Sequence, residues 1–135
     1  MNRLILIAVC LFFASSLSAQ QENKILGTWL TQHKNGKVTI TRDAKGIYSG
    51  VITWLLDPIK NNKPLADEKN PDSKLQGRAL MKLKVLSGFT YNKSDNHWVN
   101  GTIYDPKNGK TYSCKINELG DKLDVRGYVG FSLMG

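Results

Sequence analysis

The fold is decided by residues 98–130, WVNGTIYDPKNGKTYSCKINELGDKLDVRGYVG. Two turns interrupt this stretch, Asp105–Gly109 and Gly120-Asp121, and the first ends on a glycine of the kind that a positive φ favours. The segments between the turns carry the alternating pattern of strands. The stretch therefore predicts three successive antiparallel strands, over about 98–104, 111–119 and 122–128.

Side-chain alternation assigns a face to each residue of the last two strands. Polar residues separate the apolar ones in both. The expected apolar face carries Tyr112, Cys114, Ile116, Leu123, Val125 and Val129. The other face carries Thr111, Ser113, Lys115, Asn117, Asp124, Arg126 and Tyr128. A meander this regular stacks into a sheet, and it carries no catalytic signature.

Upstream residues continue the same pattern, with Asn35-Gly36 as a strong hairpin signal. Residues 47–56 are apolar on both faces, which predicts a strand that is covered on both sides or that lines a cavity. One face is expected to carry Ile47, Val51 and Leu55, and the other Tyr48, Ile52, Trp54 and Leu56. Gly50 within this segment suggests a bulge or a sharp bend. The strands expected here cover about 27–33, 37–42, 47–56 and part of 78–91.

Residues 57–77 form the irregular part, which is long compared with the usual connection of about 4–6 residues. The whole pattern predicts an all-β fold, a single meandering antiparallel barrel of about eight strands with one long loop near 57–77. A sandwich fits the pattern as well, but closure into a barrel removes the exposed edges that a small β protein must otherwise protect.

Residues 1–19 have the features of an export signal: Arg3, then an apolar run over 4–14, then the small residues of 16–19. The apolar run is too short for the roughly 20 residues of a membrane span. Cys10 is preceded by Val9, which disfavours a lipoprotein. We expect cleavage after Ala19, a bacterial periplasmic or extracellular location, and one domain over residues 20–135 with no transmembrane span.

Cleavage would leave 116 residues and lower the net charge from +8 to +7, since Arg3 is the one basic residue removed. Cys114 would then be the single cysteine, and its place on the apolar face predicts a buried, inert thiol. The fold is expected to hold without an intramolecular disulfide.

Several motifs, taken together, resemble a family of small exported bacterial proteins known as domain of unknown function DUF2147. The resemblance covers essentially the whole mature chain and is most specific over 98–112. It implies a lipocalin-like (calycin-type) barrel with room for an interior pocket, and no enzymatic activity. The motifs are Gly27-x-Trp29, Gly50-x-Ile52-x-Trp54, Asp67-x-x-Asn70-Pro71, Trp98-x-x-Gly101-x-Ile103-Tyr104-Asp105-Pro106, Gly109-Lys110-x-Tyr112 and Leu123-x-x-Arg126-Gly127-Tyr128.

Two departures from the family pattern bear on geometry. Lys82 stands where family members usually have glycine, so the local backbone of that segment is in question. Family members also usually run past the position of Gly135 into a further strand. Either the sequence is truncated or the barrel closes differently, for instance by pairing with another chain.

Candidate ligand-binding residues are the apolar side chains of the doubly apolar strand and of the meander: Tyr48, Ile52, Trp54, Tyr104 and Tyr112. The alternative is that they form an ordinary packed core. If they line a pocket, the expected ligand is small and apolar or amphipathic, with the loop over residues 57–77 at the mouth.

Gly27, Trp29 and Arg126 are expected to be structural. Arg126 has two interpretations. In the first it pairs with Asp124 on a solvated face. In the second, suggested by the resemblance to lipocalins, it lies inside the barrel and stacks on Trp29.

No metal ligand, cofactor or catalytic residue is predicted. His33 and His97 lack a second ligand at useful spacing. Residues 67–72 offer oxygen ligands for calcium, but without the spacing or glycine of an EF-hand loop. Asp57 and Asp105, each followed by proline, are a weak candidate carboxylate pair. A non-enzymatic binding module is therefore expected.

The alternative function is a structural or interaction protein of the cell envelope that uses its basic surface or an open edge strand. The lysines are scattered along the chain, and export argues against nucleic acid as a partner. Anionic lipids or polysaccharides of the envelope suit this charge better. The sequence leaves the oligomeric state open.

Overall fold

The structure is a computed structural model, and it describes residues 20–127 and the backbone of residues 130–134. The expected export signal, and the expected positions of Tyr128 and Val129, lie outside the described residues. Within the described ranges, no helix has the length and apolar character needed to cross a bilayer.

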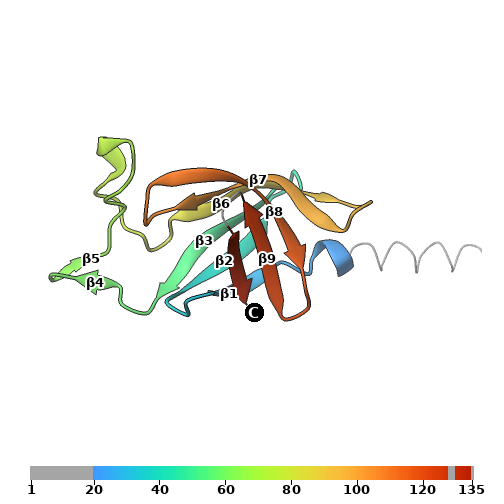
Figure 1. The fold of residues 1–135 in the computed structure, drawn as a ribbon, viewed down its shortest axis with the longest axis horizontal. Helices are drawn as coiled ribbons and strands as arrows, with labels where there is room; N and C mark the ends of the chain where they lie inside the picture. The colour runs from blue at the N-terminus through green and yellow to red at the C-terminus, as the bar shows by residue number, and fades with distance from the viewer. Residues whose placement is uncertain (1–19, 128–129, 135) are drawn as a thin grey trace, which may run out of the picture.

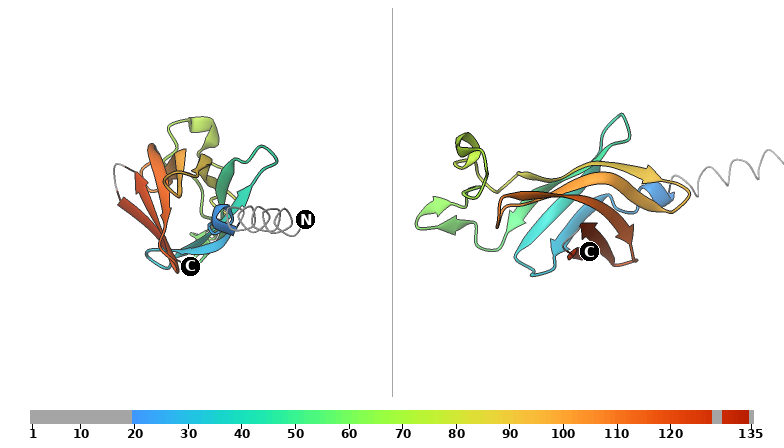
Figure 2. Two further views of the ribbon diagram at one scale, coloured as in Figure 1. Left: turned by 90° about the vertical axis from the view of Figure 1, so that its right-hand side faces the viewer. Right: turned by 45° about the horizontal axis from the view of Figure 1, so that its top comes forward.

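The described strands form a closed antiparallel barrel in the order β1-β10-β9-β8-β7-β6-β3-β2 (Figure 1). The predicted all-β barrel is confirmed. Viewed end-on, the strands form a ring (Figure 2). The eight strands that the described residues contribute are β1 (Gly27–Thr31), β2 (Gly36–Arg42), β3 (Tyr48–Leu55), β6 (Lys84–Asn92), β7 (His97–Asp105), β8 (Lys110–Glu118), β9 (Lys122–Gly127) and β10 (Gly130–Met134).

The strand β10 corrects the expectation for the end of the chain. It pairs with β9 over five residues and with β1 through Leu30↔Met134 and Thr31↔Leu133. Closure therefore occurs within one chain, and pairing with a second chain is not needed. Among the described barrel strands none is left as an open edge, so the barrel wall does not supply the open edge strand considered for the envelope hypothesis.

The predicted meander is confirmed as β7, β8 and β9. Cys114, Ile116, Leu123 and Val125 point inward and are buried, as their alternation predicted. Gly109 ends the turn between β7 and β8 at φ 72°, and its amide donates to the carbonyl of Asp105 at 2.8 Å. This hydrogen bond holds the turn at one end of the barrel.

A bulge in β3 reverses the side-chain alternation near the end of that strand. Val38 of β2 is opposite Ile52, but Lys37 is opposite Trp54, so Thr53 is the extra residue. Because one added residue exchanges the two faces of a strand, Ile52 and Leu55 both face the interior while Trp54 faces outward. The expectation that Trp54 shares a face with Ile52 was wrong for this reason.

Gly50 marks a second irregularity in β3, where the register with β6 shifts on both sides of it. An added Cβ would lie 2.9 Å from Cγ1 of Val38 and 3.0 Å from Cδ1 of Leu86. Close packing therefore excludes a side chain here, and the register shift agrees with the bulge or bend expected at Gly50.

Large aromatic residues fill the middle of the barrel. Trp98, Tyr48 and Phe89 are almost completely buried, and the rings of Tyr48 and Trp98 meet edge to face at 6.3 Å between centroids. The helical turn that precedes β1 lies at one end, where Ile25 is buried and its carbonyl accepts a hydrogen bond from Nε1 of Trp29 at 2.9 Å. This end of the barrel is closed by packed side chains.

The long connection covers the other end and is more ordered than expected. It contains a two-stranded hairpin, β4 (Ile59–Lys60) and β5 (Lys63–Pro64), and a short 3₁₀ turn, η1 (Ser73–Leu75). An isolated bridge joins Ala66 to Ala79. The hairpin projects away from the barrel, opposite the helical turn before β1 (Figures 1 and 2).

Lys82 lies where this connection returns to the barrel. Its backbone is left-handed, with φ 66°, and its amide donates to the carbonyl of Ile52 at 2.7 Å. A left-handed backbone suits glycine better than lysine. Glycine, which the resemblance in the sequence leads us to expect at this position, would suit this backbone better than Lys82 does.

Candidate functional site

A cavity of about 360 Å³ opens at the barrel end that the long connection covers. Its wall combines the turn between β1 and β2, the end of β3, the turn between β7 and β8, and two leucines of the connection. The lining residues are Thr31, Asn35, Gly36, Lys37, Val38, Ile52, Leu55, Asp57, Leu65, Leu80, Asp105, Pro106 and Lys107.

The wall is apolar and carries four charged residues. Val38, Ile52 and Leu55 come from the barrel, and Leu65 and Leu80 come from the connection above it. The charged residues are Lys37, Asp57, Asp105 and Lys107. An apolar wall with a few charged groups suits a small molecule that has one apolar and one polar part.

The connection is tied to the barrel through the buried carboxylate of Asp67. This side chain accepts hydrogen bonds from the hydroxyl of Tyr104, from Nδ2 of Asn70 at 2.8 Å and from Nε of Arg78 at 3.0 Å. Burial alone would raise the pKa of Asp67, but these donors and the charge of Arg78 outweigh it and lower the pKa. The carboxylate is therefore held ionised as an anchor.

A backbone contact completes the anchor. The carbonyl of Lys69 lies against Gly109, where an added Cβ would approach it to 1.9 Å. The amide of Gln76 also holds this segment, with Nε2 donating to the carbonyl of Asn70 at 2.9 Å. The motif over residues 67–71 and the motif over residues 104–109 thus meet in space, and together they hold the cover of the cavity.

Of the five predicted binding residues, Ile52 alone lines this cavity. Tyr48 is a core residue whose hydroxyl donates to the carbonyl of Glu22 at 2.8 Å. Trp54 faces outward, with 38% of its surface exposed. Tyr104 is half-buried against the core, and its hydroxyl donates to Asp67. Tyr112 lies opposite Ile103 and accepts from Nδ2 of Asn108 at 2.9 Å.

The structure brings in three leucines that sequence reasoning did not assign to the site. Leu55 was placed on the opposite face from Ile52 because no sequence signal marked the bulge at Thr53. Leu65 and Leu80 were treated as parts of an irregular region. They are apolar residues at the two ends of a polar loop, and the amide of Leu80 donates to the carbonyl of Leu65 at 2.9 Å.

The three residues expected to be structural have different environments. Gly27 has a positive φ of 120°, and Trp29 is buried in the core. Arg126 is on the outer surface, with its side chain 72% exposed and Nε paired with a carboxylate oxygen of Asp124. The structure therefore agrees with the solvated pair, and the alternative in which Arg126 stacks on Trp29 was wrong.

The remaining residues with possible chemistry are the aspartate pair, the cysteine and the potential metal ligands. Asp57 and Asp105 both line the cavity, and Oδ1 of Asp105 accepts from the amide of Lys107 at 2.9 Å. Cys114 is buried, and burial raises the pKa of its thiol to about 12. Over residues 20–127, no three His, Cys, Asp or Glu side chains gather as a metal site would require.

Comparison with known proteins now identifies the family. The family model described as "uncharacterized protein conserved in bacteria (DUF2147)" matches residues 27–135. The chain belongs to the DUF2147 family. This result confirms the resemblance seen in the sequence, and the matched range includes the whole barrel.

A solved structure shares the fold. It is described as protein HP1028 from the human pathogen Helicobacter pylori, which belongs to the lipocalin family. The TM-score is 0.68 at 20% sequence identity, over 82% of each chain. No curated protein matches the sequence. At this identity the comparison shows a lipocalin-like fold for this DUF2147 chain and does not extend to a ligand.

Proposed function

We propose that this DUF2147 protein is an exported, non-enzymatic barrel that binds a small apolar or amphipathic molecule in the cavity at its covered end. The observation that supports this proposal is the cavity of about 360 Å³, with its leucine, isoleucine and valine wall. This volume falls at the lower end of the range of roughly 300–1,000 Å³ for ligand sites. It suits a single short acyl chain or a small ring system.

The charged groups of the cavity add polar selectivity. Lys37 and Lys107 suit a carboxylate or phosphate on the ligand, while Asp57 and Asp105 suit an amine. An amphipathic molecule would place its apolar part against Leu55 and its polar part near these groups. Export would give the protein access to such molecules in the envelope, as the sequence of residues 1–19 suggests.

The proposal is tested with a fluorescent fatty acid, 11-(dansylamino)undecanoate, titrated into the purified protein. Leu80→Trp should fill the cavity from the connection and weaken probe binding at least about tenfold. Leu119→Trp is the matched control, because Leu119 is exposed beside the turn between β8 and β9. Equal probe binding by the two variants, or no binding by the parent protein, would reject the proposal.

Native mass spectrometry of the protein isolated from its host provides an independent test. A bound molecule should appear as a fixed mass increment on the folded protein, and the increment should be lost in Leu80→Trp. A molecule retained equally by Leu80→Trp would place the binding site elsewhere on the protein.

A further inference from the structure

Three exposed apolar side chains lie close together in the sequence, on the segment that also contributes Leu55 and Asp57 to the cavity wall. Trp54, Leu56 and Ile59 are exposed by 38%, 56% and 63%, and Leu56 and Ile59 are the most exposed of the large apolar residues in the described part of the chain. All three fall within six consecutive residues at the end of β3 and the start of the β4–β5 hairpin. Such concentration on one segment indicates an interaction surface.

The hairpin presents its residues on two distinct faces. Ile59 is opposite Pro64, and Lys60 is opposite Lys63. Because side chains alternate along a strand, the first pair makes an apolar face and the second pair a basic one. The turn between them, Asn61-Asn62, has φ values of 52° and 60°, as a tight two-residue hairpin requires. The turn therefore fixes the apolar face and the basic face on opposite sides of the hairpin.

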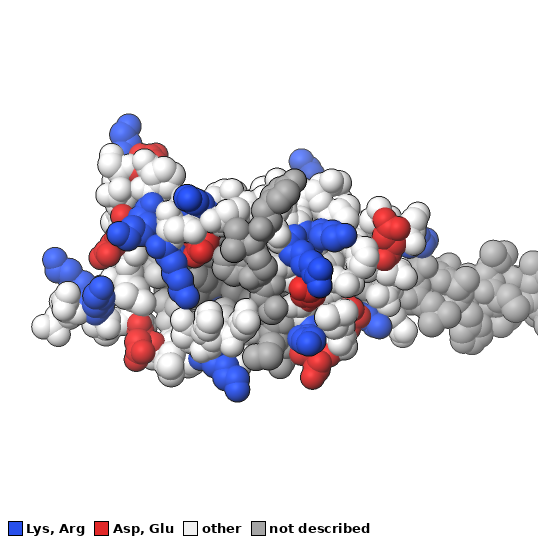
Figure 3. Space-filling model, viewed as in Figure 1, with Lys and Arg blue, Asp and Glu red and all other residues white. Residues whose placement is uncertain are grey.

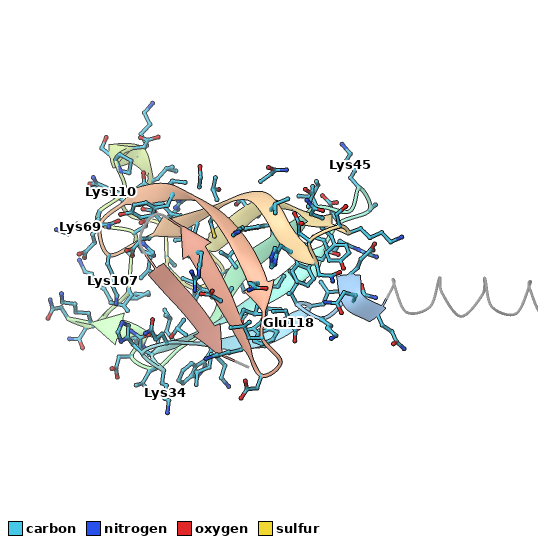
Figure 4. The ribbon with its side chains drawn as sticks, turned by 45° about the vertical axis from the view of Figure 1, so that its right-hand side comes forward. Lys34, Lys45, Lys69, Lys107, Lys110 and Glu118 are labelled. Atoms are coloured by element: carbon cyan, nitrogen blue, oxygen red, sulfur yellow. The ribbon has the colours of Figure 1, made fainter. Side chains whose placement is uncertain are left out.

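Basic groups lie on several sides of the apolar residues, with Lys60 and Lys63 on the opposite face of the hairpin from Ile59 and the exposed Asp57 within the same segment. Nζ of Lys37 lies 5.3 Å from the ring centroid of Trp54, and Lys60 and Lys63 are exposed on the hairpin. Figure 4 shows Lys69, Lys107 and Lys110 at the same end of the barrel. In Figure 3 basic side chains spread over this end, with acidic side chains between them.

We propose that this hairpin patch, defined as Trp54, Leu56, Ile59, Lys37, Lys60 and Lys63, docks the protein on the surface of an anionic phospholipid bilayer. Exposed tryptophan and aliphatic side chains beside lysines are the combination that lies at a membrane interface. Each lysine near an anionic leaflet adds to the attraction. A protein partner is less suited to the patch, because the cores of protein interfaces are depleted in lysine.

Docking in this orientation would place the cavity next to the bilayer. Lys37 belongs both to the patch and to the cavity wall, and Leu55, which lines the cavity, lies between the outward-facing Trp54 and the exposed Leu56. The docking proposal does not depend on ligand binding, and the two properties are measured separately.

The test is flotation of the purified protein with vesicles of phosphatidylcholine containing 30% phosphatidylglycerol, against vesicles of phosphatidylcholine alone. We expect binding to the anionic vesicles that falls at least about tenfold in 0.5 M salt, since screening shortens the reach of the lysine charges. Leu56→Ser with Ile59→Ser should weaken binding about tenfold or more, and Lys60→Glu with Lys63→Glu should weaken it further.

Matched controls are placed at the other end of the barrel. Lys45→Glu changes one basic residue in the turn between β2 and β3, which Figure 4 shows far from the hairpin, and Leu119→Ser changes one exposed leucine. Both should bind within about twofold of the parent protein. All variants keep the same N-terminus, so differences among them report on the patch. Thermal unfolding of each variant verifies that the barrel is intact.

Tryptophan fluorescence tests the orientation. Trp29 and Trp98 are buried, so quenching by brominated phosphatidylglycerol should act on Trp54. Trp54→Phe should lose the quenching and still float with the vesicles. Absence of binding at low salt, equal loss of binding in Lys45→Glu, or binding without quenching would each overturn the proposal. The Leu56→Ser, Ile59→Ser variant should still bind the dansyl probe, which separates docking from ligand binding.

Discussion

Replacing Asp67 with alanine should lower the free energy of unfolding by about 3 kcal/mol. The carboxylate is completely buried and accepts three hydrogen bonds, from Tyr104, Asn70 and Arg78. A single hydrogen bond to a charged group contributes about 1.5–3 kcal/mol to the free energy of unfolding. The alanine variant leaves the three donors without this acceptor.

The expected loss is lower than the sum of three such bonds. The side chain of Arg78 is 40% exposed, so water replaces its lost partner at little cost. Breaking a buried ion pair costs about 3–5 kcal/mol when the remaining charge stays buried. A value near the lower limit follows, because the charge left behind reaches solvent.

Urea denaturation followed by tryptophan fluorescence measures this change. With a urea m value of about 1.5 kcal/mol/M for a domain of this size, the midpoint should fall by about 2 M. Asp121→Ala is the matched control, because Asp121 is exposed in the turn between β8 and β9, and its midpoint should hardly move. Equal midpoints for the two variants would refute the anchoring role of Asp67.

The pH dependence provides a second test. The pKa of Asp67 is lowered in the folded protein, so the unfolded chain takes up a proton first as the pH falls. The stability that ionised Asp67 contributes is therefore present above the unfolded pKa of about 3.9, and it is lost as the pH falls through the lower folded value. The difference between the parent protein and Asp67→Ala should stay constant from pH 7 to about 5 and shrink below about 4. A difference that grows on acidification would contradict this reasoning.

Three further changes follow from backbone and packing. Lys82→Gly should raise the free energy of unfolding, measured in urea, by roughly 0.5–1 kcal/mol. The left-handed backbone costs a residue other than glycine about 1–2 kcal/mol, and the larger conformational entropy of glycine in the unfolded chain offsets part of the gain. Lys84→Gly in β6 is the control and should destabilise the protein. Gly101→Ala should cost about 1–3 kcal/mol, because the new Cβ would lie 2.4 Å from the ring of Phe89, and a smaller loss in a background with Phe89→Leu would confirm the clash. Burial and the hydrogen bond to the carboxylate raise the pKa of Tyr104 to about 12, so the unfolded tyrosine ionises first and stability should fall from pH 10 to 12 more steeply than in Tyr104→Phe.

The barrel was predictable because its strands follow a period of two. The inward positions of Cys114, Ile116, Leu123 and Val125 could all be read from alternation with polar residues. The bend at Gly50 could be read as well, because an isolated glycine in an apolar strand indicates close packing. These features depend on local sequence alone.

The cavity was predicted less well because its walls come together through long-range contacts. The bulge at Thr53 has no glycine or proline to mark it, so Trp54 was assigned to the interior and Leu55 to the other face. The role of Tyr104 depends on Asp67, which is 37 residues away in sequence. Side-chain alternation within one strand carries no information about such a partner.

The extra residue in β3 has a consequence for how this surface can change. Deleting Thr53 would make the pairs Val38–Ile52 and Lys37–Trp54 consecutive, so the indole would stay outside and the isobutyl group inside. If Thr53 were instead kept and drawn into regular pairing, the indole would enter the space now bordered by the isobutyl group, which would fill the hollow and remove the outer aromatic group together. The two properties are coupled through one bulge, and substitutions that tune one of them separately must leave that bulge in place.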